Sequence, residues 1–152
     1  MFPTTVDVVR RLRPRAFIVE NVKGLTRAAF TNYFQYIVLQ LTFPEVARRA
    51  GEDQVDHLSR LEKAKTSHRR RGLTYEVVTR VLNAADHGVP QKRERVFIVG
   101  FRDDLGVTWS FPEHTHGFDA LLETQWVTGE YWDRHEISAK ARPNRRRVTR
   151  DE

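Results

Sequence analysis

The chain has 152 residues, of which 39% are hydrophobic and 30% are charged, and 26 lysines and arginines against 20 acidic residues give it a net charge of +6. This length and composition suit one globular domain, and they exclude a disordered chain, a disulfide framework (there is no cysteine), a transmembrane helix and a signal peptide, so we expect a cytoplasmic protein without a membrane partner. The positive charge favours a polyanionic partner such as nucleic acid, although a merely basic soluble protein fits the charge equally well.

The first third of the chain predicts a helix, a strand and a second helix. Residues 5–12 repeat apolar side chains at helical spacing, and Thr5 is placed to cap that helix. Residues 16–19 form an unbroken apolar run, which is typical of a parallel strand covered on both faces. Residues 30–41 again have helical spacing and are rich in aromatic side chains, and Pro44 ends the helix.

The middle of the chain predicts a surface helix and a pair of strands. Residues 53–65 have a narrow apolar stripe, with charges on the remaining faces. Residues 75–82 and 95–101 are rich in β-branched side chains. The loop between these strands is too short for a helical crossover, so we expect them to be antiparallel neighbours.

The periodic pattern weakens after residue 104. We expect one domain over residues 1–132 and a basic, disordered tail over residues 133–152. Short basic runs occur at Arg10–Arg15, at His68–Arg71 and at Arg145–Arg147, and each could be a solvated face or tail as well as a contact with nucleic acid.

The tripeptide Glu20-Asn21-Val22 directly follows the first predicted strand. Ligands of open α/β sheets bind beyond the carboxyl ends of the strands. A carboxyl group placed there is partly desolvated and could donate a proton or a hydrogen bond to a base ring. The alternative is an exposed residue that caps the next segment.

A second polar motif, Gln91-Lys92-Arg93-Glu94-Arg95, precedes the last predicted strand. Arg93 and Arg95 are two residues apart, so they share one face of an extended segment. Two guanidinium groups on one face could bind phosphate or a base carbonyl. The alternative is an edge strand protected by charge.

Histidines and an aspartate gather in two later loops, as Asp86-His87 and as His114 and His116. A His-x-His pair in a loop is usually incidental, and no further ligand follows at a characteristic spacing. We therefore expect no metal site.

Three segments together resemble the later half of the DNA (cytosine-5)-methyltransferase catalytic domain. Residues 75–100 resemble the segment that ends in the family's Gln-x-Arg-x-Arg motif, and residues 15–25 resemble its Glu-Asn-Val segment. Residues 111–116 resemble its Phe-Pro-x-x-Thr-His continuation. The three occur in family order and cover about residues 6–132. The resemblance implies an α/β fold: a partial Rossmann-like, S-adenosylmethionine-dependent methyltransferase sheet, with the later strands and an antiparallel strand pair.

The resemblance also implies roles for individual residues. Glu20 would contact the ring nitrogen and the exocyclic amine of a flipped-out cytosine, and would stabilise the protonated ring during attack by a cysteine. Arg95 would bind the base carbonyl and the neighbouring backbone, and Arg93 would support that contact. Asn21 would hold the loop, and Gln91 would support the site.

The departures from the family pattern matter as much. The sequence contains neither the Gly-rich S-adenosylmethionine loop nor the Pro-Cys segment that carries the nucleophile. We therefore expect a fragment or subunit whose partners are DNA and a complementing chain, with S-adenosylmethionine bound mainly by residues absent from this chain. Such a half-sheet should expose an apolar edge and face. The alternatives are an inactive remnant and a non-catalytic nucleic-acid-binding module.

Overall fold

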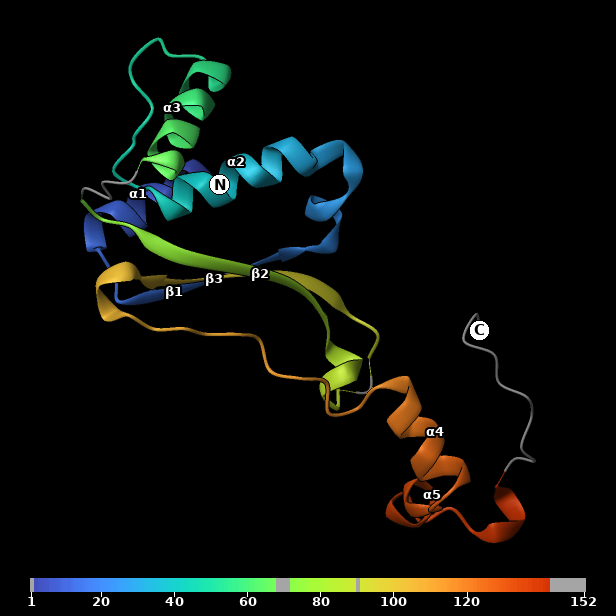
Figure 1. Cartoon of the computed structure of the whole chain (residues 1–152). Helices are drawn as coiled ribbons and strands as arrows, with labels where there is room; N and C mark the ends of the chain where they lie inside the picture. The colour runs from blue at the N-terminus through green and yellow to red at the C-terminus, as the bar shows by residue number, and fades with distance from the viewer. Residues whose placement is uncertain (1, 68–71, 90, 143–152) are drawn as a thin grey trace. The chain divides into compact units, whose positions relative to one another are not determined.

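The computed structural model describes residues 2–67, 72–89 and 91–142 (Figure 1). The chain divides into two units, Met1–Leu82 with Glu94–Pro112 and Asn83–Arg93 with Glu113–Glu152, which are treated separately below. The α-helices and strands are α1 (Phe2–Leu12), β1 (Ala16–Val22), α2 (Thr31–Thr42), α3 (Gln54–Thr66), β2 (Tyr75–Asn83), β3 (Glu94–Arg102), α4 (Phe118–Trp126) and α5 (Glu130–Arg134). Short 3-10 turns η1 (Lys23–Thr26), η3 (Ala84–His87) and η4 (Asp103–Leu105) follow the three strands in turn.

The strands of the first unit form an antiparallel sheet in the order β1-β3-β2. The expected antiparallel pair of β2 and β3 is confirmed. The parallel, doubly covered environment expected for residues 16–19 is wrong for the part of the chain described: β1 pairs antiparallel with β3, with Ile18 opposite Val99. Burial alternates along β1, and the Ile18 side chain is 71% exposed, because the helices cover only one face of the sheet.

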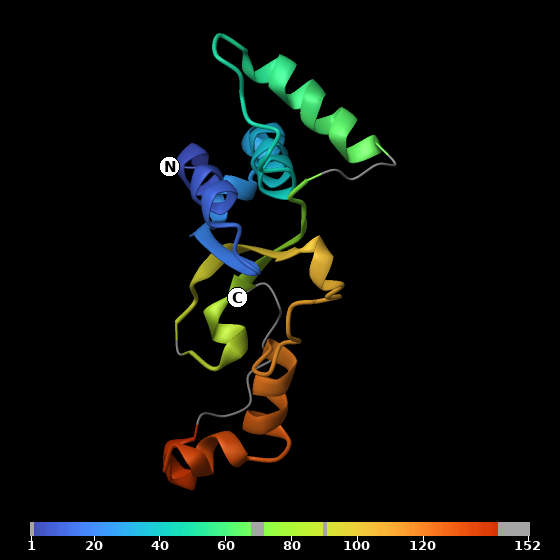
Figure 2. The same cartoon turned by 90° about the vertical axis from the view of Figure 1, so that its left-hand side faces the viewer.

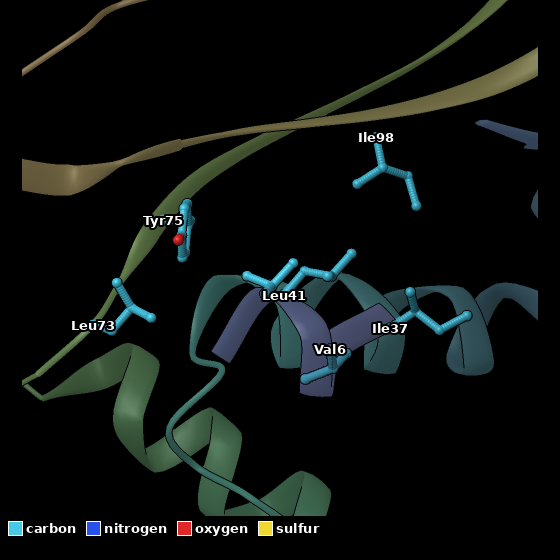
Figure 3. Close-up of a cluster of buried hydrophobic side chains, with 7 residues drawn as sticks. Val6, Ile37, Leu41, Leu73, Tyr75 and Ile98 are labelled. Carbon is cyan, nitrogen blue, oxygen red and sulfur yellow. The ribbon is translucent and has the colours of Figure 1, made fainter. Parts of the chain in front are cut away.

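Helices α1 and α2 lie together on that face in both views (Figures 1 and 2). Their apolar side chains meet those of the strands, so that Ile98 of β3 and Tyr75 of β2 point toward Ile37 and Leu41 of α2 (Figure 3). The buried members of this cluster are Val6, Val9, Ile37, Leu41, Leu73, Tyr75 and Ile98.

Helix α1 begins earlier than the sequence pattern indicated. It starts at Phe2, so Thr5 lies inside the helix and the prediction that it caps the helix is wrong. Pro3 is compatible with this start, because a first-turn residue needs no backbone N–H for an intrahelical bond.

Helix α3 is held to α2 around a buried histidine. Its start is capped by Asp53, whose side chain accepts a 2.8 Å hydrogen bond from the Asp56 amide. The ring of His57 lies 2.6 Å from the Tyr36 hydroxyl through Nδ1 and 2.6 Å from the Val46 carbonyl through Nε2. Burial raises the pKa of Tyr36, so its hydroxyl keeps its proton and donates to Nδ1. Nε2 then carries the ring proton and donates to Val46.

The second unit contains two helices that the sequence pattern did not indicate, α4 and α5. Aromatic rings hold them together: Trp132 packs edge-on against Trp126 and Tyr131, at centroid distances of 5.7 and 4.9 Å. Trp132 is the only buried residue among those described in this unit. This unit is therefore built with little apolar burial.

The expected boundary between a domain and a tail at residue 132 stays a prediction. Residues 133–142 contain the end of α5 and a 2.6 Å ion pair between Arg142 and Asp133. Residues 143–152, and with them the basic run at 145–147, lie outside the described residues, as does the run at 68–71. No helix among the described residues is long and apolar enough to cross a membrane.

Candidate functional site

Glu20 and Arg95 are brought together by the pairing of β1 with β3. In this register Val22 lies opposite Arg95 and Glu20 lies opposite Phe97. Glu20 and Arg95 are therefore diagonal neighbours on one face of the sheet, within reach of long side chains. Arg95 Nε and Glu20 Oε1 lie 2.9 Å apart and form an ion pair. The structure thus joins two residues that the sequence singled out separately.

This pair lies on the face of β1 that no helix covers. The Glu20 side chain is 46% exposed, so solvent reaches it, and the expected partial desolvation of its carboxyl group stays a prediction. Arg95 is more enclosed, at 24%, and its Nη1 donates to the Glu94 carbonyl over 2.8 Å. Among the described residues, Glu20 Oε2 and Arg95 Nη2 have no hydrogen-bond partner. A carboxylate oxygen can accept a hydrogen bond from an amine, and a neighbouring guanidinium can donate one to a carbonyl, so the pair could bind a ring that carries both groups on one edge.

A second ion pair flanks the first. Lys23, in the turn η1 after β1, lies 2.6 Å from Glu94 Oε1, so the end of β1 and the start of β3 are linked twice. Asn21 Oδ1 accepts a 2.8 Å hydrogen bond from the Val22 amide. Asn21 therefore fixes the local backbone at the end of β1, and it alternates to the opposite face from Glu20.

Arg93 and Gln91 belong to the second unit. β3 begins at Glu94, so Arg93 lies in the loop that precedes the strand, with an exposed side chain. Its backbone amide donates to Asn83 Oδ1 over 3.0 Å, and its carbonyl accepts from the Ala84 amide over 3.0 Å. Gln91 is also exposed, and its amide donates to the Val89 carbonyl over 2.7 Å. That Arg93 and Arg95 act on one face stays a prediction.

Sequence reasoning did not single out Asn83 as a site residue. It ends β2 and accepts hydrogen bonds from both the Ala85 and the Arg93 amides. An asparagine between a strand and a turn is a common signal for such side-chain-to-backbone bonds, and this was the available clue.

The histidines of the second unit gather around Asp86. His114 Nδ1 lies 3.6 Å from Asp86 Oδ2, and the rings of His87 and His114 are 5.5 Å apart. No group of three or more potential ligands in the described part of the chain is arranged to hold a metal ion.

The described residues do not fit an S-adenosylmethionine site. A methyl donor of this kind is typically held where a strand leads through a glycine-rich turn into a helix. Here each strand leads into a 3-10 turn instead, and η1, which contains Gly24, has no second glycine. No step of donor chemistry is assigned to these residues.

Comparison with known proteins identifies the family. Residues 55–147 match the family described as C-5 cytosine-specific DNA methylase. The chain is 40% identical over 110 residues to the type II methyltransferase M.AquIA of a Picosynechococcus species, which covers 72% of this chain and 35% of that protein. It is 36% identical over 118 residues to M.BspRI of Lysinibacillus sphaericus, and the match covers 78% of this chain and 21% of M.BspRI. It is 38% identical over 111 residues to M.SacI of Streptomyces achromogenes, and the match covers 73% of this chain and 20% of M.SacI.

These relatives match the chain over most of its length, whereas the chain spans only 20 to 35% of theirs. The family match covers more than half of the chain, including β2, β3 and the described helices of the second unit. On this evidence the chain belongs to the C-5 cytosine-specific DNA methylase family.

Proposed function

We propose that this chain forms the glutamate and arginine side of the cytosine pocket of a DNA (cytosine-5)-methyltransferase. The observation that carries the proposal is the ion pair of Glu20 and Arg95 on the open face of β1. The target carbon lies within the DNA stack, so the cytosine must be flipped out of the duplex to reach such a pair. Glu20 Oε2 then faces the ring nitrogen and amine, and Arg95 Nη2 faces the base carbonyl.

The pair has a defined part in the chemistry. Addition of a thiolate to the sixth carbon breaks the ring double bond and shifts an electron pair toward the ring nitrogen. Glu20 stabilises a proton on that nitrogen, and Arg95 stabilises the negative charge that grows on the carbonyl oxygen. The chain contains no cysteine, so the thiolate must come from other residues of the enzyme. S-adenosylmethionine, held by those same other residues, supplies the methyl group.

The sheet supports the same assignment. We infer that β1, β3 and β2 are the later strands of a Rossmann-like methyltransferase sheet. The order β1-β3-β2 contains the expected antiparallel pair of β2 and β3, and it leaves one edge of β1 unpaired among the described residues. An unpaired strand edge is a template for another strand. We propose that the rest of the methyltransferase domain, on a complementing chain that carries the cysteine and the donor loop, pairs with this edge.

An apolar groove supports this docking proposal. The groove has a volume of about 590 Å³ and is lined by residues of α1 and β1, among them Val8, Val9 and Ile18. Ile18 and Val22 are exposed on either side of Glu20 in β1. A segment that covers these two side chains comes to lie beside the Glu20 carboxylate. The relatives, of which this chain spans a third or less, have the length to supply such a segment.

The catalytic proposal is tested by complementation. The probe is the part of M.AquIA outside the third that this chain matches, co-expressed with the full chain, and the measurement is single-turnover methyl transfer to DNA. Glu20→Gln keeps the shape of the side chain but loses the dissociable proton, and we expect a rate loss of about 10²–10⁴-fold with assembly unchanged. An unchanged rate in the Glu20→Gln complex would show that Glu20 is only a strand-end residue.

The docking proposal is tested by binding of the same probe. Ile18→Asp places a charge in the apolar groove and should weaken binding at least tenfold. Val55→Asp is the matched control, because Val55 is similarly exposed, at 72%, but lies on α3 away from the groove. Equal binding by the two variants would count against this surface. Dimerisation of the chain alone, abolished by Ile18→Asp, would assign the groove to a second copy instead.

One alternative function has its own support. The net charge of +6 and the exposed Arg93 fit a nucleic-acid-binding module without catalysis. Such a module would bind duplex DNA with a steep salt dependence, and neither the chain alone nor its mixture with the probe would transfer methyl groups. An inactive remnant would show neither property.

A further inference from the structure

We propose that Asn83, locked by the Thr115-His116 segment, positions Arg93 for contact with a DNA phosphate. The inference rests on the proposed function only for the identity of the ligand. The mechanical part, a clamp around the loop of residues 83–93, rests on contacts within the second unit alone.

Asn83 closes the base of the loop. Its Oδ1 accepts hydrogen bonds from two amides, those of Ala85 (3.3 Å) and Arg93 (3.0 Å). The Ala84 amide donates to the Arg93 carbonyl over 3.0 Å, so both backbone polar groups of Arg93 are bound. The two ends of the loop are thus joined at Arg93.

The interior of the loop is a compact turn. The Gly88 amide donates to the Ala85 carbonyl over 3.2 Å, and the Val89 amide donates to the Ala84 carbonyl over 3.2 Å. Gly88 has φ +88°, a left-handed conformation that a residue with a Cβ adopts only with strain. The turn therefore has one strongly preferred backbone path.

The Thr115-His116 segment closes the loop from outside. The Asp86 carbonyl accepts from the Thr115 amide (3.0 Å) and from the His116 amide (2.9 Å). The His116 ring lies against Gly88, where an added Cβ would be only 3.0 Å from Cε1. The Thr115 hydroxyl and His116 Nδ1, 2.8 Å apart, hold that ring in place. The Thr115-His116 dipeptide, which has no role in the proposed base pocket, thus stabilises this loop.

The fixed backbone of Arg93 should reduce the entropy cost of binding a phosphate. The Arg93 backbone is fixed at both polar groups, whereas its side chain is exposed. A guanidinium that starts from a fixed backbone loses less freedom when it binds a phosphate. Opening the clamp should therefore weaken a phosphate contact without removing the arginine itself.

The clamp is tested on the full chain by limited trypsin digestion, because Lys92 and Arg93 are cleavage sites inside the loop. Asn83→Ala removes the acceptor and His116→Ala removes the ring, and both should speed cleavage at these sites severalfold. Asn83→Ser keeps a side-chain oxygen that can accept hydrogen bonds and places no second charge beside Asp86, so it should restore part of the protection. Thr124→Ala is the control, since this hydroxyl bonds only within α4 in the part of the chain described. Equal cleavage of Asn83→Ala and Thr124→Ala would overturn the clamp.

The positioning role is tested by affinity for a duplex oligonucleotide, so it does not depend on methyl transfer. Asn83→Ala and Arg93→Ala should each weaken binding about 3–10-fold, and Arg93→Ala, which removes the charge itself, should also reduce the slope of log affinity against log salt by about one. The double variant should be no weaker than Arg93→Ala, because Asn83 acts only through that residue. Asn83→Ser should recover part of the affinity. Additive losses in the double variant would overturn the positioning role, even where the trypsin result supports the clamp.

Discussion

An arginine stands near each end of β3, and the two are held in different ways. Arg102 donates from Nε and Nη2 to both oxygens of Asp104, over 2.7 and 3.1 Å, and from Nη1 to the Arg13 carbonyl over 2.9 Å. Arg95 uses Nε for Glu20 and Nη1 for the Glu94 carbonyl. Similar fractions of the two side chains are exposed, 28% and 24%, so burial does not separate them.

The difference lies in the donors that remain. Arg102 has every nitrogen engaged, and its hydrogen bonds lower the pKa of Asp104 while Asp104 raises the pKa of Arg102. This is a closed unit that ties the end of β3 to the residues before β1. Arg95 keeps Nη2 free among the described residues, next to a carboxylate with a free oxygen. The comparison shows that unsatisfied donors, rather than exposure, distinguish Arg95 as the candidate for binding a ligand.

Replacing each arginine by alanine should give the largest measurable difference between the two ends of β3. In the complemented enzyme, Arg95→Ala removes a donor aimed at the base carbonyl, and we expect a loss of about 10²–10³-fold in kcat. Arg102→Ala should leave kcat within a few fold, because its donors all serve the fold. The measurements are methyl-transfer kinetics and thermal unfolding of both variants. Equal kcat losses would show that Arg95 is as structural as Arg102.

A close contact between β1 and β3, near the Arg102 end of β3, offers a test of the strand register. Gly100 lies opposite Phe17, whose ring atoms would be 2.3–2.9 Å from an added Cβ. Phe17 in turn packs on Tyr75, at a ring distance of 5.1 Å, so it has little room to move. We expect Gly100→Val to destabilise the chain by roughly 1–3 kcal/mol, as overpacking does.

Urea unfolding of Gly100→Val measures this effect. Gly24→Ala is the matched control, because the nearest atoms to its added Cβ are 3.9 Å away. If Gly100→Val unfolds at the same urea concentration as Gly24→Ala, the close approach of Phe17 does not fix the register.

Much of the fold followed from the sequence, and the failures have physical causes. β2 and β3 were predictable because their β-branched residues are bounded by turn residues. The environment of β1 was not, because the all-apolar run at residues 16–19 does not reveal which side chains lie under a helix. Helices α4 and α5 were missed because they are held by aromatic pairs such as Trp126 with Trp132, and not by an apolar stripe.

For the site, the sequence supplied the residues but not their geometry. Glu20 and Arg95 were each recognised as candidates, yet their ion pair depends on the register that sets Val22 opposite Arg95. Register between distant strands is decided by the packing of the whole sheet. The sequence also could not show that no helix covers the face that carries Glu20 in the part of the chain described.

The smallest expected effect concerns the closed end of β3. Because hydrogen bonds from Arg102 lower the pKa of Asp104 in the folded chain, the ionised carboxylate favours folding. That contribution is fully present above the unfolded pKa of about 4 and is lost as the pH falls through the lower folded value. Asp104→Asn should therefore lower stability slightly at pH 7, and the stabilities of wild type and variant should begin to converge as the pH falls below about 4. Urea titrations of both proteins between pH 3 and pH 7 measure the difference. A difference for Asp104→Asn that persists unchanged at pH 3 would mean that shape, and not charge, holds this end of the strand.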